Sequence, residues 1–244
     1  MENSCWFHNW FNSPYYHQLY NNRNDKEARE FIHNLVKALE FKKQYKIWDI
    51  ACGKGRHSIC LAEHGMQVTG TDLAENNILQ AKQHVTDNPE FLIHDMRTPF
   101  RVNYFDAVLN LFTSIGYFED ERDNLKVFKN IHSALKKNGV FVLDFFNAEF
   151  IKLHLLTETT EKRGDTIFHI TKKINNNKVI KRIGFSDKGK NVHFEERVSL
   201  FDENYFREIA GHSGLEHVNT FGDYSLQPFD PEKSPRLIMT FKKI

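Results

Sequence analysis

The first residues suited to chemistry lie between Ile47 and Gly55. A short apolar run, Ile47–Ile50, contains Asp49 and leads directly to Gly53 and Gly55. Glycine adopts backbone angles that other residues avoid, and the missing side chain lets a ligand approach the backbone closely. The pattern is typical of a strand-to-helix turn that binds a nucleotide-like ligand. An ordinary strand–helix turn can carry the same two glycines. The spacing of further polar groups therefore has to distinguish a ligand-binding turn from an ordinary one.

Two more carboxylates follow at informative spacings. Asp72 ends a second strand-like run, about 20 residues after the glycines, where a carboxylate can accept hydrogen bonds from both hydroxyls of a ribose. Asp95 ends a third run, where a side chain can reach the exocyclic amine of an adenine. A fourth run, Phe105–Asn110, comes next to the point at which ligands bind in open α/β sheets. These positions together predict an adenosine-containing ligand.

Two kinds of adenosine ligand compete for this site. A dinucleotide dehydrogenase has a third glycine where this chain has Ser58, and an acid such as Asp49 is unfavourable beside a pyrophosphate. An acid at that place suits a ligand with ammonium and sulfonium charge, as in S-adenosyl-L-methionine (SAM). The residues therefore favour methyl transfer over hydride transfer.

Alternating strand and helix patterns must position these groups. An amphipathic helix is predicted first, over Asp25–Glu40. Strand–helix alternation implies right-handed crossovers and a parallel sheet with helices on both faces. The predicted strands are Lys46–Ile50, Gln67–Thr71, Phe91–Ile93, Phe105–Leu111 and Val140–Asp144, and the predicted helices between them are about Arg56–His64, Ala74–Val85 and Glu119–Lys136.

The pattern changes after Asn147. A short helix near 148–156 precedes three alternating segments, which indicate an antiparallel meander. A helix and a final strand pair follow. The segments are Thr166–Ile174, Val179–Phe185 and Val192–Leu200, then Asp202–His212, Leu215–Phe221 and Arg236–Phe241. We expect one domain over residues 1–244, with a β-rich insert at about 148–201.

With these elements, the motifs resemble those of the class I SAM-dependent methyltransferases over most of the chain. Asp49–Gly55 is similar to the glycine-rich motif, Asp72 to the ribose carboxylate, and Asp95 with Met96 to the adenine pair. The stretch from Asp95 to Tyr117 is similar to small-molecule N-methyltransferases of the aminosugar N,N-dimethyltransferase type. The resemblance implies a Rossmann-like, seven-stranded, mostly parallel sheet of order 3-2-1-4-5-7-6. It also implies helices on both faces and an antiparallel β insert after the fifth strand.

The resemblance implies SAM as the cofactor and a small molecule as the methyl acceptor. An aromatic N-terminal segment, about 1–24, is expected either to cover the site as a lid that contacts the methionine carboxylate or to serve as core packing. Tyr117 and Tyr16 are candidate catalytic residues, although spacing alone assigns neither a role. The expected cofactor-binding residues are Tyr20, Arg23, Asp49, Ala51, Gly53, Gly55, Asp72, Leu73, Asp95, Met96 and Asn110.

The net charge of the chain helps to choose between a small-molecule methyltransferase and a protein that acts on RNA. The chain has 33 Lys and Arg against 32 Asp and Glu, a formal charge of +1, which argues against a dedicated nucleic-acid binder. The segment Lys172–Lys190 is nevertheless strongly basic, which keeps an RNA-directed methyltransferase as an alternative to a solvated hairpin face. A SAM-binding scaffold without activity is a third hypothesis, and the intact acidic and glycine motifs argue against it.

Other features predict the compartment and exclude a metal. Three cysteines without a Cys-x-x-Cys spacing predict neither a disulfide framework nor a zinc site, and the 13 histidines are scattered. The chain has no signal-peptide pattern and no run near the roughly 18 apolar residues that span a membrane. We therefore expect a cytoplasmic methyltransferase that binds no metal and no membrane and methylates a small molecule at nitrogen. The acceptor and the oligomeric state do not follow from the sequence.

Overall fold

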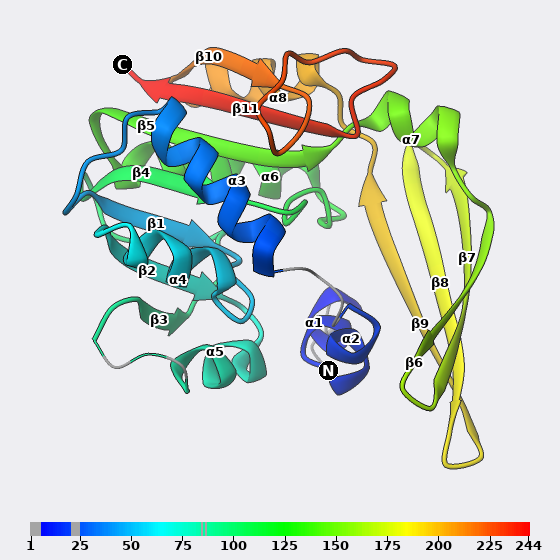
Figure 1. Cartoon of the computed structure of the whole chain (residues 1–244). Coiled ribbons are helices and arrows are strands. Elements are labelled where there is room, and N and C mark those ends of the chain that lie inside the picture. The colour runs from blue at the N-terminus through cyan, green and yellow to red at the C-terminus, as the bar shows by residue number, and fades with distance from the viewer. Residues whose placement is uncertain (1–5, 21–24, 84, 86) are drawn as a thin grey trace.

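A seven-stranded sheet forms the centre of the computed structural model, which describes residues 6–20, 25–83, 85 and 87–244 (Figure 1). The strand order is β10-β11-β5-β4-β1-β2-β3. Strands β3, β2, β1, β4 and β5 pair in parallel, whereas β11 pairs antiparallel with β5 and β10. The predicted order 3-2-1-4-5-7-6 is confirmed, because β11 and β10 occupy the last two places. The strands are β1 (Lys46–Ile50), β2 (Gln67–Asp72), β3 (Glu90–Ile93), β4 (Phe105–Asn110), β5 (Leu135–Phe146), β10 (Leu215–Phe221) and β11 (Arg236–Lys243).

Helices cover both faces of this sheet. Helices α3 (Asp25–Ala38) and α4 (Arg56–Glu63) pack over Ile47 and its neighbours on one face. Helices α6 (Glu121–Ala134) and α8 (Glu203–Gly211) pack over Trp48 on the other face. Successive strand residues point to opposite faces, so an apolar strand such as β1 supplies both cores. Helix α5 (Glu75–Lys82) packs beside β3 at the edge.

The junction of α6 and β5 differs from the prediction. The helix ends at Ala134 and the strand begins at Leu135, before the predicted start at Val140. Leu135 is fully buried and pairs with Phe105, so the strand begins before the turn signal at Asn138, which keeps a positive φ of 64°. The turn residues lie inside the strand instead, close to a register shift in the β4–β5 pairing.

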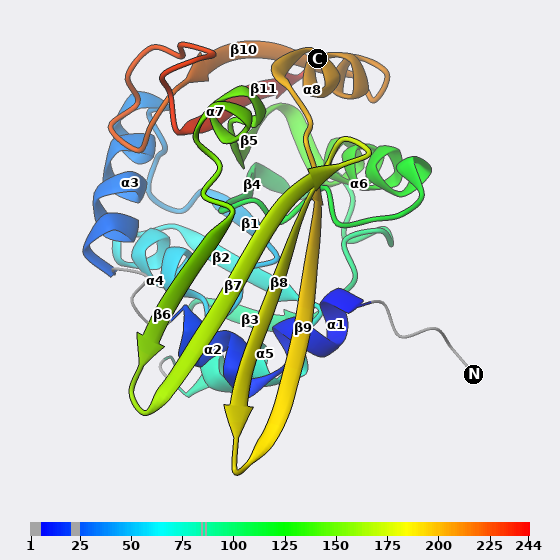
Figure 2. The same cartoon turned by 90° about the vertical axis from the view of Figure 1, so that its right-hand side faces the viewer.

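The β-rich insert is a separate antiparallel sheet of order β6-β7-β8-β9 that follows α7 (Ala148–His154) (Figure 2). Its strands are β6 (Glu158–Arg163), β7 (Thr166–Asn175), β8 (Lys178–Asp187) and β9 (Lys190–Ser199). The prediction of three strands was wrong because it omitted β6. That strand has no apolar residue, so hydrophobic alternation cannot reveal it, and its charged side chains suit the edge that it forms.

Two short helices, α1 (Trp6–Phe11) and α2 (Pro14–Leu19), lie between the main sheet and the insert (Figures 1 and 2). Ser13 caps α2, because its hydroxyl accepts hydrogen bonds from the backbone N–H groups of Tyr15 and Tyr16. The side chains of Trp10 and Leu19 are buried in a cluster with apolar residues of the insert. Among the described residues, no helix has the length and apolar character needed to span a membrane.

Candidate active site

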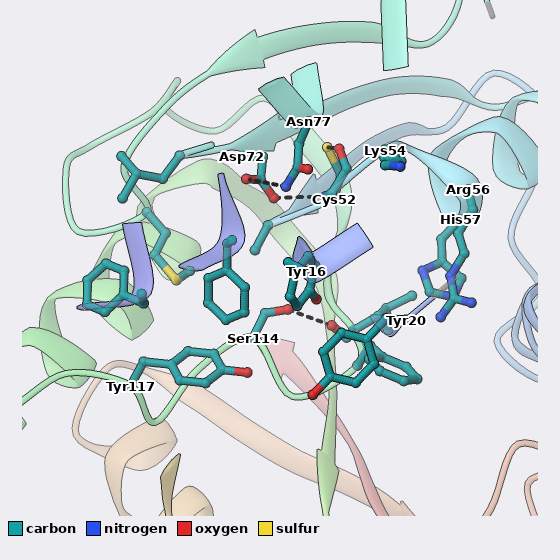
Figure 3. A pocket seen from close by; sticks show the side chains of 18 of the residues that line it. Tyr16, Tyr20, Cys52, Lys54, Arg56, His57, Asp72, Asn77, Ser114 and Tyr117 are labelled. Atoms are coloured by element: carbon teal, nitrogen blue, oxygen red, sulfur yellow. Dashed lines mark hydrogen bonds between the residues drawn. The ribbon is translucent and has the colours of Figure 1, made fainter. Parts of the chain in front are cut away.

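A cavity of about 430 Å³ lies at the carboxyl ends of the central strands, where they face α1, α2 and the insert (Figure 3). Asp72, Asn77 and Cys52 lie on one side of it, and Tyr20 and Tyr117 lie across from them. The structure brings together most of the predicted site residues on its wall: Tyr16, Tyr20, Ala51, Gly53, Asp72, Leu73, Asp95, Met96 and Tyr117.

The two glycines of the β1–α4 loop play different structural parts. Both have positive φ angles, +59° at Gly53 and +80° at Gly55. A Cβ atom on Gly53 would meet no heavy atom within 4 Å, so the backbone there is open to a ligand. A Cβ atom on Gly55 would lie 2.2 Å from the ring of Phe91 on β3. Gly55 therefore permits close packing of loop and strand, and it does not line the cavity.

Asp72 fastens the glycine loop to the end of β2. Its Oδ2 accepts a hydrogen bond from the N–H of Gly53 at 2.8 Å, and its Oδ1 accepts bonds from the N–H of Ala74 at 2.8 Å and from Asn77 Nδ2 at 3.2 Å. Burial raises the pKa of the Asp72 carboxyl, while these hydrogen bonds act in the opposite direction. The carboxylate is thus held in one orientation at the cavity wall.

Asn77 lines the cavity as well, although sequence reasoning missed it. Its Oδ1 is buried without a hydrogen-bond partner among the described residues. A buried amide oxygen without a partner is unfavourable, so a hydroxyl donor from a ligand would satisfy it. The signal available in the sequence was its place in the first turn of the helix after Asp72. The Asp72–Asn77 pair fits a ribose, which brings two hydroxyl groups.

Asp49 lies behind the glycine loop rather than on the cavity wall. Its side chain is buried and accepts a hydrogen bond of 2.5 Å from Ser58 Oγ. Burial raises the pKa of Asp49 to about 7, against the opposing effect of the Ser58 bond. Asp49 is therefore not among the described residues that line the cavity, because the strand directs its side chain into the interior, and its expected role in cofactor binding stays a prediction. Ser58, at the place of a third glycine, is its hydrogen-bond partner.

Another expected cofactor residue, Asn110, is not among the described residues that line the cavity. Asn110 is fully buried, and its Nδ2 donates to the carbonyl oxygen of Ile50 at 3.4 Å, which ties β4 to β1. Arg23 falls outside the described residues. Asp95, which follows the end of β3, lines the cavity and forms an ion pair of 2.6 Å with Arg97. Burial acts to raise the pKa of Asp95, but hydrogen bonds from Arg97 hold that pKa below its usual value.

The opposite end of the cavity is walled by aromatic rings. The ring centroid of Phe11 lies 4.9 Å from that of Tyr16 and 5.4 Å from that of Tyr117. The hydroxyl of Tyr117 donates to the carbonyl oxygen of Thr113 in its own loop. Sequence reasoning missed two wall residues here because they become neighbours only through the tertiary fold. These residues are Phe118 and Glu196, whereas Phe7 and Phe11 belong to the aromatic segment that was expected either as a lid or as core packing.

The basic stretch of the insert is paired with acids on β9. Lys181 lies opposite Glu196 and Arg182 lies opposite Glu195 in the β8–β9 register. The Arg182–Glu195 pair has a distance of 2.8 Å. This pairing reduces the positive potential that the sequence of β8 alone suggests. Within the described ranges, no group of three or more His, Cys, Asp or Glu side chains could hold a metal ion.

Comparisons with known proteins agree with this geometry. Residues 48–143 match the family model described as "Methyltransferase domain". Over 103 residues the chain is 40% identical to the putative methyltransferase YqeM of Bacillus subtilis, and this match covers 41% of each protein, less than half of the relative. A structure of an S-adenosylmethionine-dependent methyltransferase from Clostridium acetobutylicum superposes with a TM-score of 0.78 at 19% identity, covering 93% of this chain and 96% of that one.

Two longer matches are N-methyltransferases. The chain is 27% identical over 213 residues to glycine/sarcosine N-methyltransferase of Aphanothece halophytica, covering 83% of this chain and 76% of that protein. It is 24% identical over 183 residues to dTDP-3-amino-3,6-dideoxy-alpha-D-glucopyranose N,N-dimethyltransferase of Streptomyces fradiae, covering 71% of each. The predicted resemblance and the predicted cofactor, SAM, are confirmed. Residues 48–143 therefore form a methyltransferase domain, within the fold of the SAM-dependent methyltransferases.

Proposed function

We propose that the protein is an enzyme that transfers a methyl group from SAM to a small-molecule acceptor, at nitrogen. The observation that carries the proposal is the arrangement of Asp72, Asn77 and the open backbone of Gly53 on one cavity wall. A fixed carboxylate and an unsatisfied amide oxygen suit the ribose of an adenosine. Asp95 and Met96 lie on the same wall, where the adenine would be held.

The chain contributes alignment and exclusion of water more than reactive groups. SAM supplies a methyl group activated by the positive charge on its sulfur. Asp72 and Asn77 would hold the ribose, while the ring cluster of Phe11, Tyr16 and Tyr117 would form a dry wall for the acceptor. Orientation of reactants of this kind is worth up to roughly 7–11 kcal/mol of the barrier. A neutral amine already carries the electron pair that attacks the methyl carbon, so no wall residue has to act as a base.

We also infer that the main sheet, the N-terminal helices and the insert act as one functional unit. The cavity takes its wall from the carboxyl end of the main sheet, from α1 and α2 with Tyr20, and from β9 of the insert. A nitrogen acceptor is supported by the two N-methyltransferases to which most of the chain is similar. The cross-strand ion pairs of the insert weaken the alternative of an RNA acceptor.

Titration calorimetry tests the proposal. We expect SAM and S-adenosylhomocysteine to bind with micromolar dissociation constants, about −8 kcal/mol, and NAD not to bind. Incubation with methyl-labelled SAM and a panel of small amines should then transfer label to an amine. Binding of NAD without binding of either SAM compound would refute the cofactor. Cofactor binding without transfer to any amine, alcohol or RNA tested would favour the scaffold hypothesis.

A further inference from the structure

The insert places one acid, Glu196 of β9, on the cavity wall, and this side chain is largely buried with 14% of its surface exposed. Its Oε1 accepts two hydrogen bonds, from Trp10 Nε1 at 2.6 Å and from the Tyr20 hydroxyl at 2.8 Å. Its Oε2 lies 3.8 Å from Lys181 Nζ, which is an ion-pair distance beyond hydrogen-bond length. Among the described residues, Oε1 therefore accepts two hydrogen bonds, whereas Oε2 has only the longer ion-pair contact.

This inequality leaves Glu196 able to bind a further donor. An ionised carboxylate can accept about four hydrogen bonds, and Oε2 has the greater remaining capacity. Lys181 donates to the Tyr20 hydroxyl and is not among the described residues that line the cavity. Because Glu196 lines the cavity, we expect a ligand there to be able to donate a hydrogen bond to this carboxylate.

The other acids near the cavity have different positions. Asp72 and Asp95 lie at the end where the nucleoside would bind, and each is already held by several hydrogen bonds. Asp25 lines the cavity from the start of α3 and is exposed. Glu196 is the acid that lies next to the aromatic wall, because Tyr20 contacts both Glu196 and the ring of Tyr16, 4.9 Å away between centroids.

We propose that Glu196 recognises the amino group of the acceptor, accepting an N–H hydrogen bond from it, and so selects amines over alcohols. The inference rests on the proposed function and names its substrate class: a small amine with an apolar or ring-shaped body. Phe11, Tyr16 and Tyr117 would pack against such a body, and the faces of their rings would favour the positive charge that the nitrogen gains on methylation.

The charge movement in the reaction suits this position. The nitrogen electron pair forms a bond to the methyl carbon, the carbon–sulfur bond breaks, and its electron pair stays on sulfur. Positive charge passes from sulfur to nitrogen, and the methylated ammonium then loses a proton to water. A carboxylate beside the nitrogen stabilises the charge that develops there. An alcohol acceptor has to lose its proton to react, and the resulting alkoxide becomes neutral on methylation, so a carboxylate beside it has no developing positive charge to stabilise.

A purely structural role is the competing explanation, because Glu196 also ties β9 to α1 and to Tyr20. Three variants separate the two roles. Glu196→Gln keeps an oxygen that can accept the bonds from Trp10 and Tyr20 but removes the charge. Trp10→Phe removes one tie and keeps the charge. Glu195→Gln is the matched control, because the neighbouring side chain points to the other face of β9 and pairs with Arg182 and Arg197.

The experiment is calorimetric titration of protein saturated with S-adenosylhomocysteine. The probes are benzylamine, n-propylamine and glucosamine, each compared with benzyl alcohol, n-propanol and glucose respectively. In the unaltered protein, Glu195→Gln and Trp10→Phe, we expect at least one amine to bind more tightly than its alcohol. In Glu196→Gln that preference should fall about tenfold or more, as expected for loss of a hydrogen bond to a charged group.

Three results would overturn the proposal. They are an absence of any amine preference in the unaltered protein, a preference that survives in Glu196→Gln, and an equal loss in Trp10→Phe. Thermal unfolding of each variant checks that it is folded. Saturation with S-adenosylhomocysteine is itself the first measurement. If it does not bind, the proposed function fails, whereas if it binds and the amine preference is independent of Glu196, this inference alone fails.

Discussion

Arg236 and Asp144 form an ion pair beneath the loop that follows β4. Arg236 Nη2 lies 2.6 Å from Asp144 Oδ1, and the Asp144 side chain is 1% exposed. Asp144 Oδ2 accepts the N–H of Phe112 at 2.8 Å, and Arg236 Nη2 donates to Thr113 Oγ1 at 3.1 Å. Phe112 and Thr113 have φ angles of 63° and 58°, which are uncommon for residues other than glycine. The pair therefore holds a strained loop that leads to Tyr117 on the cavity wall.

Removal of the negative charge from this pair should affect stability and turnover more than cofactor binding. Asp144→Asn leaves the Arg236 charge buried without its partner, which should cost about 3–5 kcal/mol of unfolding free energy. Turnover should fall because the loop loses its support, while S-adenosylhomocysteine affinity should stay within a few-fold. Urea unfolding and calorimetry measure the two effects. Unchanged stability would show that the pair contributes little, and Asp120→Asn, at an exposed helix cap, is the control.

Asp72 is expected to be the main determinant of cofactor affinity. Asp72→Asn replaces one carboxylate oxygen with an NH₂ group, which faces the backbone donor of either Gly53 or Ala74 and removes one acceptor for the ribose. We expect a loss on the order of 2–4 kcal/mol in S-adenosylhomocysteine binding by calorimetry. Asn77→Ala should give a smaller loss, on the order of 1 kcal/mol, because a neutral acceptor is removed. Affinities equal to that of the unaltered protein would place the ribose elsewhere.

Asp49 should make stability depend on pH. Its pKa rises from an ordinary 3.8 to about 7 in the folded protein, chiefly through burial. The folded state therefore holds this proton more tightly than the unfolded chain does. Its contribution is fully present below the unfolded pKa, and it is lost as pH rises from about 4 to about 7. The shift of roughly 3 units corresponds to about 4 kcal/mol over this window.

Asp49→Asn provides the comparison. The amide keeps an oxygen that can accept the bond from Ser58 but does not titrate. We expect the unfolding free energy of the unaltered protein, relative to the variant, to fall between about pH 4 and pH 7 and then to level off. Urea unfolding across this range measures it. Parallel pH profiles for the two proteins would mean that the pKa of Asp49 is the same in the folded and unfolded states.

The main sheet could be predicted from sequence because its strands follow from local signals. Short, mainly apolar runs such as Ile47–Ile50, bounded by glycine or helical periodicity, are typical of strands buried on both faces. Asp72 could be predicted for the same reason, since strand ends in a parallel sheet meet along one edge. The orientation of Asp49 could not, because its distance from the glycines does not tell which face of the strand it points to.

Glu196, Asn77 and β6 show what sequence could not supply. Glu196 meets Tyr20 and Trp10 across more than 170 positions, so no local pattern links them. Asn77 belongs to the site because α5 begins directly after Asp72, and a single unsatisfied oxygen is visible only in three dimensions. Strand β6 is held by backbone pairing with β7 rather than by apolar side chains.

Tyr117, one of the candidate catalytic residues, should not act as a base. Its hydroxyl donates to the carbonyl oxygen of Thr113, so the ring shapes the wall and the hydroxyl supports the loop. We expect Tyr117→Phe to retain turnover within about tenfold, with an unchanged pH profile. Loss of a general base would instead cost on the order of 10²–10⁴-fold and alter that profile. Steady-state kinetics with labelled SAM decides between the two.

The N-terminal helices should respond to ligand together with the insert. Trp10 and Leu19 fill the core beside Phe168 and Ile183, so α1 and α2 are packed against the insert. We expect binding of S-adenosylhomocysteine to slow hydrogen exchange over residues 10–20 and over β9 together, because the cavity wall spans both segments. Equal exchange with and without ligand would leave the aromatic segment as core packing alone.

Deletion of residues 1–20 is a second test of the same segment. The deletion removes Tyr16 and Tyr20 from the cavity wall and exposes the apolar residues that Trp10 and Leu19 cover. We therefore expect turnover to be lost and exchange in the insert to quicken. The main sheet should keep its protection, because its two cores lose only Phe7 among their buried residues and retain helices α3, α4, α6 and α8. A truncated protein that retains full turnover would contradict a lid, since displacement at a sulfonium requires an acceptor held against the cofactor with water excluded.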